Sequence, residues 1–260
     1  MNKNLINYFF LTLIAILPIS FVIGPAISLI NVLIFDLSFL ALLLSKKNFD
    51  WIKAPIIKIL IFFYIYLIFN SLISLDYNSN LLRNFGFIRL IILFIGLNYF
   101  FKDKNFSKVL FFWSFIIFII IFDIFFERIF GNNTLGFSSG NQRRIVSFFK
   151  DEMIVGGYVY AFLFIIIGFY FELYKSKNLW IKSFLFLGIT VSFLSILITG
   201  ERSNTIRFFL SLLIFLSLVD FLDLKKKFLI LISIVIIFTT VLAKNEYLKT
   251  RMYDSLLYSS

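Results

Sequence analysis

The chain has 260 residues, of which 61% are hydrophobic and 15% are charged, with a net charge of +11. A soluble protein of this length cannot keep so much apolar surface from water, and about 25% of its residues would be charged. The composition therefore excludes a soluble enzyme, a secreted domain and a disordered chain, and it predicts a protein that crosses a membrane many times. Cys and His are both absent, which excludes disulfides, thiolate metal sites and imidazole ligands.

Nine stretches approach the length of about 17–25 apolar residues that a membrane-spanning helix needs. In chain order they are Leu5–Ile23, Ala26–Leu44, Ala54–Ser74, Gly86–Phe101, Val109–Phe126, Ile154–Tyr174, Ile181–Ile198, Ser203–Leu222 and Phe228–Ala243. Gly24-Pro25 predicts a turn between the first two helices, and Asn132–Gln142 is the one long polar loop. We expect an all-α fold, a polytopic transmembrane helical bundle that forms a single domain over residues 1–260.

The distribution of charge predicts the orientation of these spans. With the N-terminus in the cytoplasm, the inner segments hold 14 cations and a net charge of +9, and the outer segments hold 11 cations and a net charge of +3. The positive-inside rule then places the N-terminus in the cytoplasm and the C-terminus in the periplasm. Most of the positive charge reflects topology, so we expect no nucleic-acid partner.

Lys and Arg differ more sharply between the two sides of the membrane than the net charge does. All 14 inner cations are Lys, whereas all eight Arg fall on the outer side. Arg carries a planar fork of donors that binds phosphate or carboxylate with two hydrogen bonds, which Lys does not. The outer side therefore looks built to hold an anion. The alternative is that these Arg residues brace the outer loops by pairing with acids, of which the candidates are Glu201, Asp151, Glu152, Asp123 and Glu127.

The segment TGERSN, residues 199–204, joins the seventh and eighth spans. Gly200 can end one helix, and Ser203 or Asn204 can cap the next. Arg202 then lies at a helix N-terminus, where free backbone N–H groups already favour an anion. Arg207 lies five residues further along the same helix and can flank the ligand.

Other candidate anion ligands lie at outer ends of other spans. The segment RRIVSFFKDE, residues 143–152, brings Arg143 and Arg144 to the outer interface, although composition alone favours an ordinary charged loop end there. Arg83 and Arg89 flank the start of the fourth span and could contact a phosphate or simply extend to the interface. Asp36 is a lone acid within the second span, which makes it a functional candidate that could equally be protonated or paired.

The chain resembles the O-antigen ligase and O-antigen polymerase superfamily at these motifs. Residues 144–158, from Arg144 through Gly157 to Tyr158, resemble that family's Arg…Phe…Gly-Tyr segment. Residues 199–202 resemble its Thr-Gly-x-Arg motif, and Leu17-Pro18…Gly24 is also similar. Family members continue with a large periplasmic loop containing His and with further spans. The resemblance therefore implies that residues 1–260 are the N-terminal part of such a protein and lack its acceptor-activating base.

The resemblance implies a metal-independent, cofactor-free glycosyltransferase of the bacterial inner membrane. Such proteins take a glycan from a polyprenyl-diphosphate carrier at the periplasmic face and pass it to lipid A core or to a glycan acceptor. By this interpretation, Arg202 is the first candidate for catalysis and for diphosphate binding, followed by Arg143, Arg144, Arg207, Arg83 and Arg89. Two alternatives remain open, a transporter or flippase for a lipid-linked or anionic solute, and a non-catalytic assembly subunit.

Overall fold

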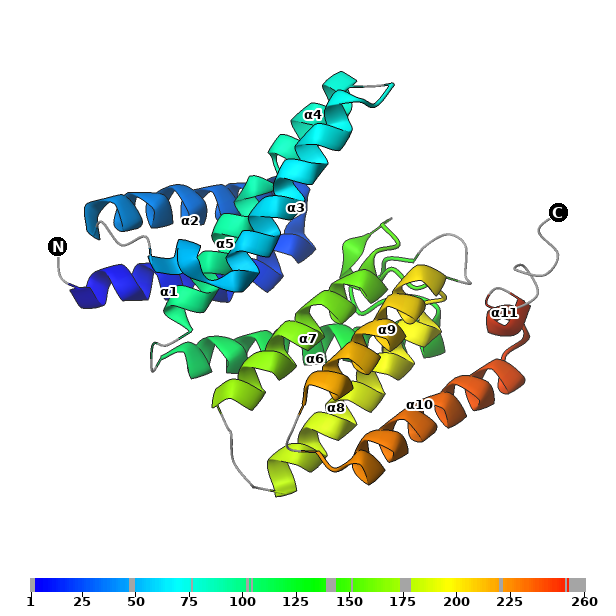
Figure 1. Ribbon diagram of the computed structural model, residues 1–260. Coiled ribbons are helices and arrows are strands. Elements are labelled where there is room, and N and C mark those ends of the chain that lie inside the picture. Colours follow the sequence, from blue (N-terminus) through cyan, green and yellow to red (C-terminus); the bar gives the residue numbers. More distant parts are fainter. Residues whose placement is uncertain are drawn as a thin grey trace. The chain divides into compact units, whose positions relative to one another are not determined.

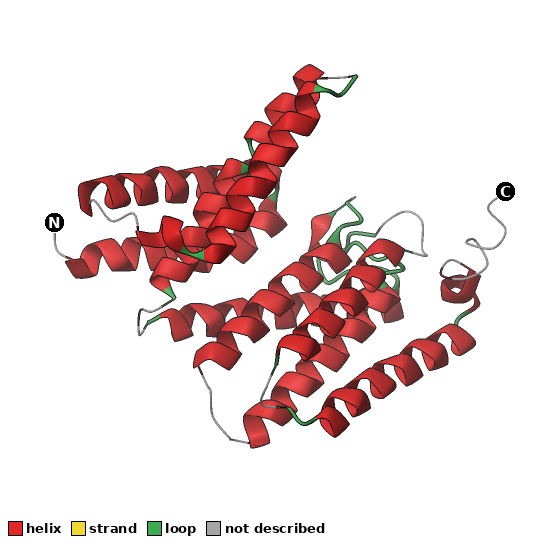
Figure 2. Cartoon of the chain, viewed as in Figure 1, coloured by secondary structure: helices red, strands yellow, loops and turns green. Residues whose placement is uncertain are grey.

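A computed structural model describes residues 3–46, 50–75, 77–101, 103, 105–138, 144–150, 152–173, 179–219, 222–250 and 252 of the chain (Figure 1). Helices make up most of this part of the chain, and no strand occurs within it (Figure 2). The predicted all-α fold is therefore confirmed.

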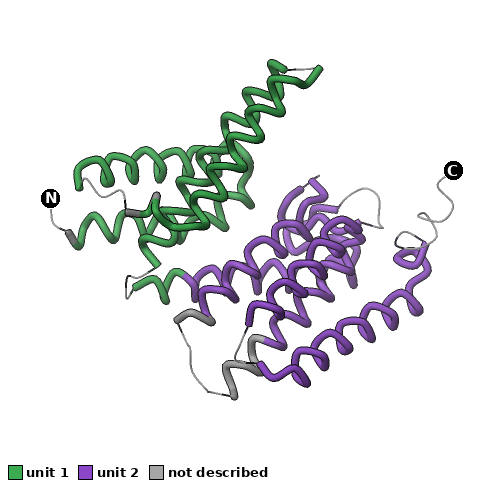
Figure 3. The backbone as a smooth tube through the Cα atoms, viewed as in Figure 1, with its two compact units in different colours: residues 1–109 green, residues 110–260 purple. Residues whose placement is uncertain are grey.

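The chain forms two compact units, residues 1–109 and residues 110–260, shown in green and purple in Figure 3. The sequence predicted one helical domain, and each unit is described by itself below. The helices of the first unit are α1 (Lys3–Ile23), α2 (Pro25–Lys46), α3 (Pro55–Leu72), α4 (Tyr77–Phe85) and α5 (Ile88–Phe100), with the short 3₁₀ helix η1 (Asp50–Lys53) before α3. The second unit contains nearly all of α6 (Phe106–Phe130), then η2 (Ser147–Phe149), α7 (Val155–Leu173), α8 (Leu179–Ile198), α9 (Arg202–Leu218), α10 (Leu224–Lys244) and α11 (Glu246–Lys249).

Within the described residues, six helical segments are long and apolar enough to cross a membrane. They are Asn4–Ile23, Pro25–Lys46, Pro55–Leu72, Tyr77–Phe100, Phe106–Phe130 and Leu224–Lys244. Two shorter apolar segments, Val155–Tyr170 and Phe186–Ile198, lie in the second unit. Each of the nine predicted ranges overlaps a helix, whereas the number of helices that cross the membrane and their direction stay predictions.

The fourth predicted span begins later than the helical segment does. The sequence predicted a start at Gly86, but helical structure already begins with α4, and a turn at Gly86 and Phe87 separates it from α5. The α4 sequence, YNSNLLRNF, is too polar to stand out by its hydropathy. The two Arg residues of this region thus lie on either side of a break between helices.

Turn residues fix where the first helices begin. Gly24 has φ +149°, which L side chains rarely adopt, and Pro25 begins α2. Proline suits a first helical position because it has no N–H to leave unpaired and its φ is already helical. The turn predicted at Gly24-Pro25 is confirmed, and α1 and α2 pack against each other beyond it.

Aromatic rings fill the core of the first unit, where α2 packs against α1 and α5. Phe10 stacks on Phe100 with 4.6 Å between ring centroids and meets Phe35 edge-on at 5.6 Å. Gly96 of α5 admits the Phe35 ring, because a Cβ at residue 96 would overlap the Phe35 Cε1 atom. Glycine at this position therefore sets how closely α2 and α5 approach.

In the second unit, α8 lies at the centre of the packing, with α7, α9 and α10 against it. Trp113 of α6 is buried and meets Phe162 of α7 edge-on at 5.4 Å. Phe193 of α8 packs on Phe208 of α9 at 5.3 Å. α7 and α9 also pack directly against each other, and the first turn of each contains residues of the predicted motifs.

Candidate functional site

The Glu201 side chain joins the two motifs that the sequence singled out. Its Oε1 atom accepts a hydrogen bond of 2.9 Å from the Gly156 backbone N–H, in the first turn of α7. Its Oε2 atom accepts a hydrogen bond from the side-chain amide of Asn204. A carboxylate at this position also suits the positive end of the α7 dipole. Residues 144–158 and 199–204, which are distant in the sequence, therefore form one site.

Three of the predicted Arg residues lie around Glu201. Arg144 is half-buried, attracts the Glu201 carboxylate and contacts the Met153 sulfur. The Arg207 Nη1 atom donates to Asn204 Oδ1 over 3.4 Å. Arg202 is the first residue of α9, and within the described part of the chain its side chain makes no hydrogen bond or ion pair. Its guanidinium is therefore free to bind a ligand beside free N–H groups at the start of a helix.

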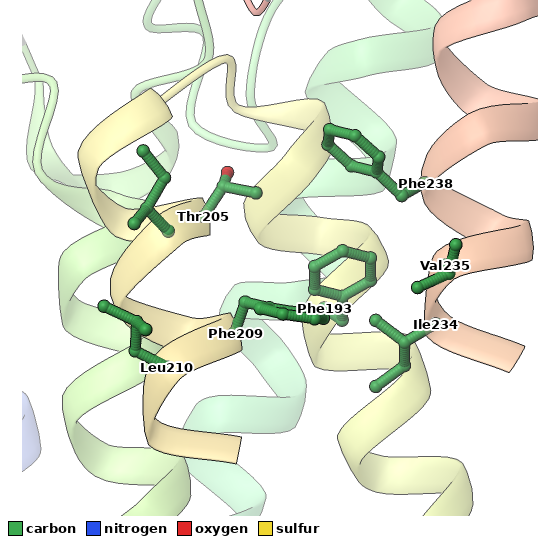
Figure 4. Close-up of a pocket in the computed structure, with 8 residues that line it drawn as sticks. Phe193, Thr205, Phe209, Leu210, Ile234, Val235 and Phe238 are labelled. Atoms are coloured by element: carbon green, nitrogen blue, oxygen red, sulfur yellow. The ribbon is translucent and has the colours of Figure 1, made fainter. Parts of the chain in front are cut away.

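An apolar cavity of about 290 Å³ lies beside α9, between this helix, α8 and α10 (Figure 4). It is lined by Phe193, Thr205, Ile206, Phe209, Leu210, Ile234, Val235 and Phe238. Phe193, Thr205 and Ile234 are buried and form its floor, whereas Ile206, Leu210 and Val235 are exposed and form its rim. A rim of exposed aliphatic side chains suits entry from a hydrocarbon environment.

The cavity and Arg202 share one face of α9. Thr205, Ile206, Phe209 and Leu210 follow Arg202 by three, four, seven and eight residues, which is the spacing of a single helical face. The α9 face that begins with a free cation at its first turn thus continues as the wall of an apolar cavity. This arrangement matches an amphiphile with an anionic head and a hydrocarbon chain.

Arg83 and Arg89 line a separate cavity of about 370 Å³ in the first unit, together with Asn80, Asn84, Gly86, Phe87 and Leu90. Its wall is tied to α3, because the Asn84 amide donates to Ser71 Oγ over 2.6 Å and to the Leu67 carbonyl over 3.2 Å. The start of α5 also lies in this wall. The structure therefore brings Arg83 and Arg89 into one polar cavity, as a phosphate contact requires.

Asp123 and Glu127 of α6, which the sequence offered as partners of the Arg residues, bind the backbone and hydroxyl groups of a loop. Asp123 accepts hydrogen bonds from the Thr134 backbone N–H and hydroxyl and from the Ser147 hydroxyl, at 2.6–2.9 Å. Glu127 accepts the backbone N–H groups of Val146, at 3.2 Å, and Ser147, at 2.6 Å. Buried N–H groups need acceptors, and these two carboxylates supply them.

Asn133 and Ser147 complete this buried network and were not predicted. The Asn133 amide donates to the Ser147 carbonyl over 2.5 Å, while its side-chain oxygen accepts from the N–H groups of Leu135, at 3.0 Å, and Phe137, at 2.7 Å. Ser147 has φ +49°, a left-handed conformation that is strained for a residue with a Cβ. The polar composition of residues 132–142 indicated a loop, and no local pattern indicated that α6 would hold it.

The second unit contains three further residues that the sequence predicted as ligands or partners. Arg143 and Asp151 lie outside the described residues, and Glu152 is exposed. Among the described residues, no group of three or more His, Cys, Asp or Glu side chains could hold a metal ion. Two separate candidate sites therefore remain, one with Arg144, Arg202, Arg207 and Glu201 in the second unit, and one with Arg83 and Arg89 in the first.

Replacing Gly156 with Ala should disrupt the Glu201 contact. The added Cβ would lie 3.0 Å from Thr199 Oγ1 and 3.1 Å from Glu201 Cδ, so α7 and residues 199–201 would have to separate. We expect a loss of about 1–3 kcal/mol in the free energy of unfolding. Gly168 on the same helix is the matched control, because a Cβ there meets no atom within 4 Å, and Gly168→Ala should be neutral or stabilising. Equal thermal stability of the two variants in detergent would contradict this.

The pKa of Glu201 gives the site a predictable dependence on pH. Partial burial raises the pKa of this carboxyl above its ordinary value, and hydrogen bonds from Gly156, Asn204 and Gly157, together with the Arg144 charge, oppose the shift. A raised native pKa means that the folded protein holds the proton more tightly than the unfolded chain. The stabilisation is present below the ordinary Glu pKa and is lost as the pH rises through the folded-state value.

Denaturation of the wild type and Glu201→Gln at several pH values tests this linkage. The free energy of unfolding of the wild type should increase relative to that of the variant as the pH falls from neutral to the ordinary Glu pKa. If the difference in free energy of unfolding between the two proteins stays constant or shrinks over this range, burial is not the dominant influence on the pKa of Glu201.

No family model, curated protein or solved structure matches this chain. The resemblance to the O-antigen superfamily thus stays a prediction from residues 144–158 and 199–202.

Proposed function

We propose that the protein binds a polyprenyl-diphosphate-linked glycan and transfers the glycan to an acceptor, as O-antigen ligases and polymerases do. One observation carries this proposal: Arg202, free of partners in the described chain, begins the α9 face that lines the apolar cavity. A diphosphate fits the cation, and a polyprenyl chain fits the cavity. The cavity, of about 290 Å³, would hold a segment of that chain and leave the rest in the bilayer.

The arginines would act on the leaving group. An acceptor hydroxyl oxygen forms the new bond to the anomeric carbon, the bond from that carbon to the diphosphate oxygen breaks, and the electron pair leaves with the diphosphate. The hydroxyl proton passes to a base. Preorganised cations stabilise the charge that gathers on the leaving group, and stabilisation of this kind usually lowers the barrier more than any other single effect. Arg202 supplies a bidentate contact to the diphosphate, with Arg144 and Arg207 beside it.

The location that this function requires agrees with the pattern of charge along the chain. We place the N-terminus of a nine-span bundle in the cytoplasm and the Arg-bearing ends of α7 and α9 in the periplasm of a bacterial inner membrane. A polyprenyl-diphosphate donor and a lipid A core or glycan acceptor would meet there.

Blocking the rim of the cavity tests the proposal. Ile206→Trp would fill the entrance with a larger side chain and should weaken binding of a polyprenyl diphosphate about tenfold or more, with little effect on inorganic pyrophosphate. Ile214→Trp is the matched control, since Ile214 is also on α9, is 61% exposed against 57% for Ile206, and does not line the cavity. Equal affinities of both variants for the lipid would remove the cavity from the binding site.

Assays with reconstituted protein separate transfer from transport. The purified intact protein in vesicles should join a labelled glycan to its acceptor without moving the lipid-linked donor between leaflets. Translocation of the donor with no transfer would instead identify a flippase.

A further inference from the structure

Asp36 is a buried carboxylate that the proposed reaction does not use. It lies in the middle of α2 and is 3% exposed. Within the described part of the chain, neither of its carboxylate oxygens accepts a hydrogen bond. An ionised carboxylate without donors is costly in such surroundings, so it either keeps an opposite charge nearby or takes up a proton.

Two buried polar side chains on the N-terminal half of α2 are already engaged. The Asn31 amide donates to the Leu13 carbonyl over 3.3 Å and to Ser20 Oγ over 3.4 Å. Ser28 donates to the Pro25 carbonyl over 2.9 Å. Hydrophobic rings cover the rest, including Phe35, which fits against Gly96 of α5. Within the described residues, the Asp36 carboxylate is therefore affected by charges at a distance and not by a hydrogen-bond donor.

Apart from Asp36, few charged or titratable residues lie on α1, α2 and α5. These are Lys3 and Tyr8 on α1, Lys46 on α2, and Arg89 and Tyr99 on α5. Lys46 lies at the far end of α2 and donates to the Tyr99 hydroxyl over 3.0 Å. Lys3 lies at the start of α1, and Tyr8 is largely exposed. Arg89 is the group whose charge attracts Asp36.

Arg89 connects this buried acid to the polar cavity of the first unit. It lines that cavity beside Arg83, at the start of α5, while α5 packs along α2. An anion held by Arg83 and Arg89 offsets part of the Arg89 charge. The ionised form of Asp36 then loses the attraction that supports it in an environment without hydrogen-bond donors.

We propose that Asp36 is a proton-binding site coupled to this cavity, so that binding of a phosphate group at Arg83 and Arg89 is accompanied by uptake of a proton at Asp36. The coupling rests on the proposed anion-binding role of these two arginines. It is reciprocal, so a protonated Asp36 favours the bound phosphate. Raising the pH removes the proton and weakens binding.

Calorimetry on the full chain tests the coupling, with inorganic pyrophosphate as the probe. Titrations in buffers of different ionisation enthalpy give the number of protons taken up for each anion bound. The wild type should take up more protons than Asp36→Asn, and the protonation change of pyrophosphate itself is common to both. The affinity of the wild type for pyrophosphate should also fall at least fivefold as the pH rises, and about fivefold is the low end of typical coupling between sites. The affinity of Asp36→Asn for pyrophosphate should change less over the same range.

Two further variants make the outcome specific. Asp223→Asn alters an exposed carboxylate paired with Lys226 at 3.2 Å and should keep the proton uptake of the wild type. Arg89→Ala should lose the pyrophosphate held in this cavity and the proton uptake coupled to it, while pyrophosphate bound at Arg202 is kept. Equal proton uptake by the wild type and Asp36→Asn, with pyrophosphate bound, overturns the coupling and leaves the anion-binding role of Arg83 and Arg89 standing. If neither Arg83→Ala nor Arg89→Ala lowers the amount of pyrophosphate bound per chain, both the coupling and this anion site are overturned, and glycan transfer still tests Arg202 separately.

Discussion

Arg202→Lys is expected to lower glycan transfer by the intact protein about 100-fold or more, although the positive charge is kept. Lys places a single ammonium where Arg offers a planar fork, so the two-point contact to the diphosphate is lost. Removing one preorganised donor from a developing anion costs about 10²–10³ in rate. The loss should appear mainly in kcat, because the contact strengthens as charge gathers on the leaving group.

Arg128→Lys provides the matched control for this measurement. Arg128 lies in the last turn of α6, in the same unit, and belongs to neither candidate cavity. It should keep transfer within about twofold of the wild type, since exposed or half-exposed charges contribute little. If Arg202→Lys transfers glycan at the same rate as Arg128→Lys, then Arg202 does not contact the leaving group.

Glu127→Ala should cause a large loss of stability in the second unit. Glu127 is 4% exposed, and its carboxylate accepts the N–H groups of Val146 and Ser147. Truncation leaves both groups buried without an acceptor, at about 1–3 kcal/mol each. We expect a total near 3 kcal/mol, which corresponds to a fall of roughly 10 °C in Tm for a unit of this size.

Thermal unfolding in detergent measures this loss. Asp223→Ala is the control, because it removes an exposed carboxylate whose pair with Lys226 is a surface contact worth less than about 1 kcal/mol. A Glu127→Ala protein that melts within 2 °C of Asp223→Ala would mean that residues 144–149 are held by other contacts than Glu127.

The helices and the first turn could be predicted because their causes are local. Runs of apolar residues specify membrane-length helices, and Gly24 followed by Pro25 specifies a break between two of them. The helical segment of the fourth predicted span starts earlier than the sequence predicted. Its first helix, α4, is too polar to be recognised by hydropathy.

The sequence allowed the residues of the candidate site to be chosen by type, but it did not predict which contacts they make. Arg144, Arg202 and Glu201 could be chosen because Arg and acids gather beside helix ends. That Glu201 would bind the Gly156 N–H, 45 residues away, depends on how α7 and α9 cross α8. The pairing of Asp123 and Glu127 with loop backbone was equally hidden, because an acid in a sequence does not reveal which buried N–H groups lack an acceptor.

The contact between Glu201 and Gly156 has a mechanical consequence. It fixes the spacing between the first turns of α7 and α9 directly, without relying on α8, while α10 packs against α8 at the other side of the apolar cavity. A tilt of α10 can therefore widen the cavity without changing the separation of Arg144 and Arg202. The arginine end of the site would then stay rigid while its hydrocarbon end adapts to chains of different thickness.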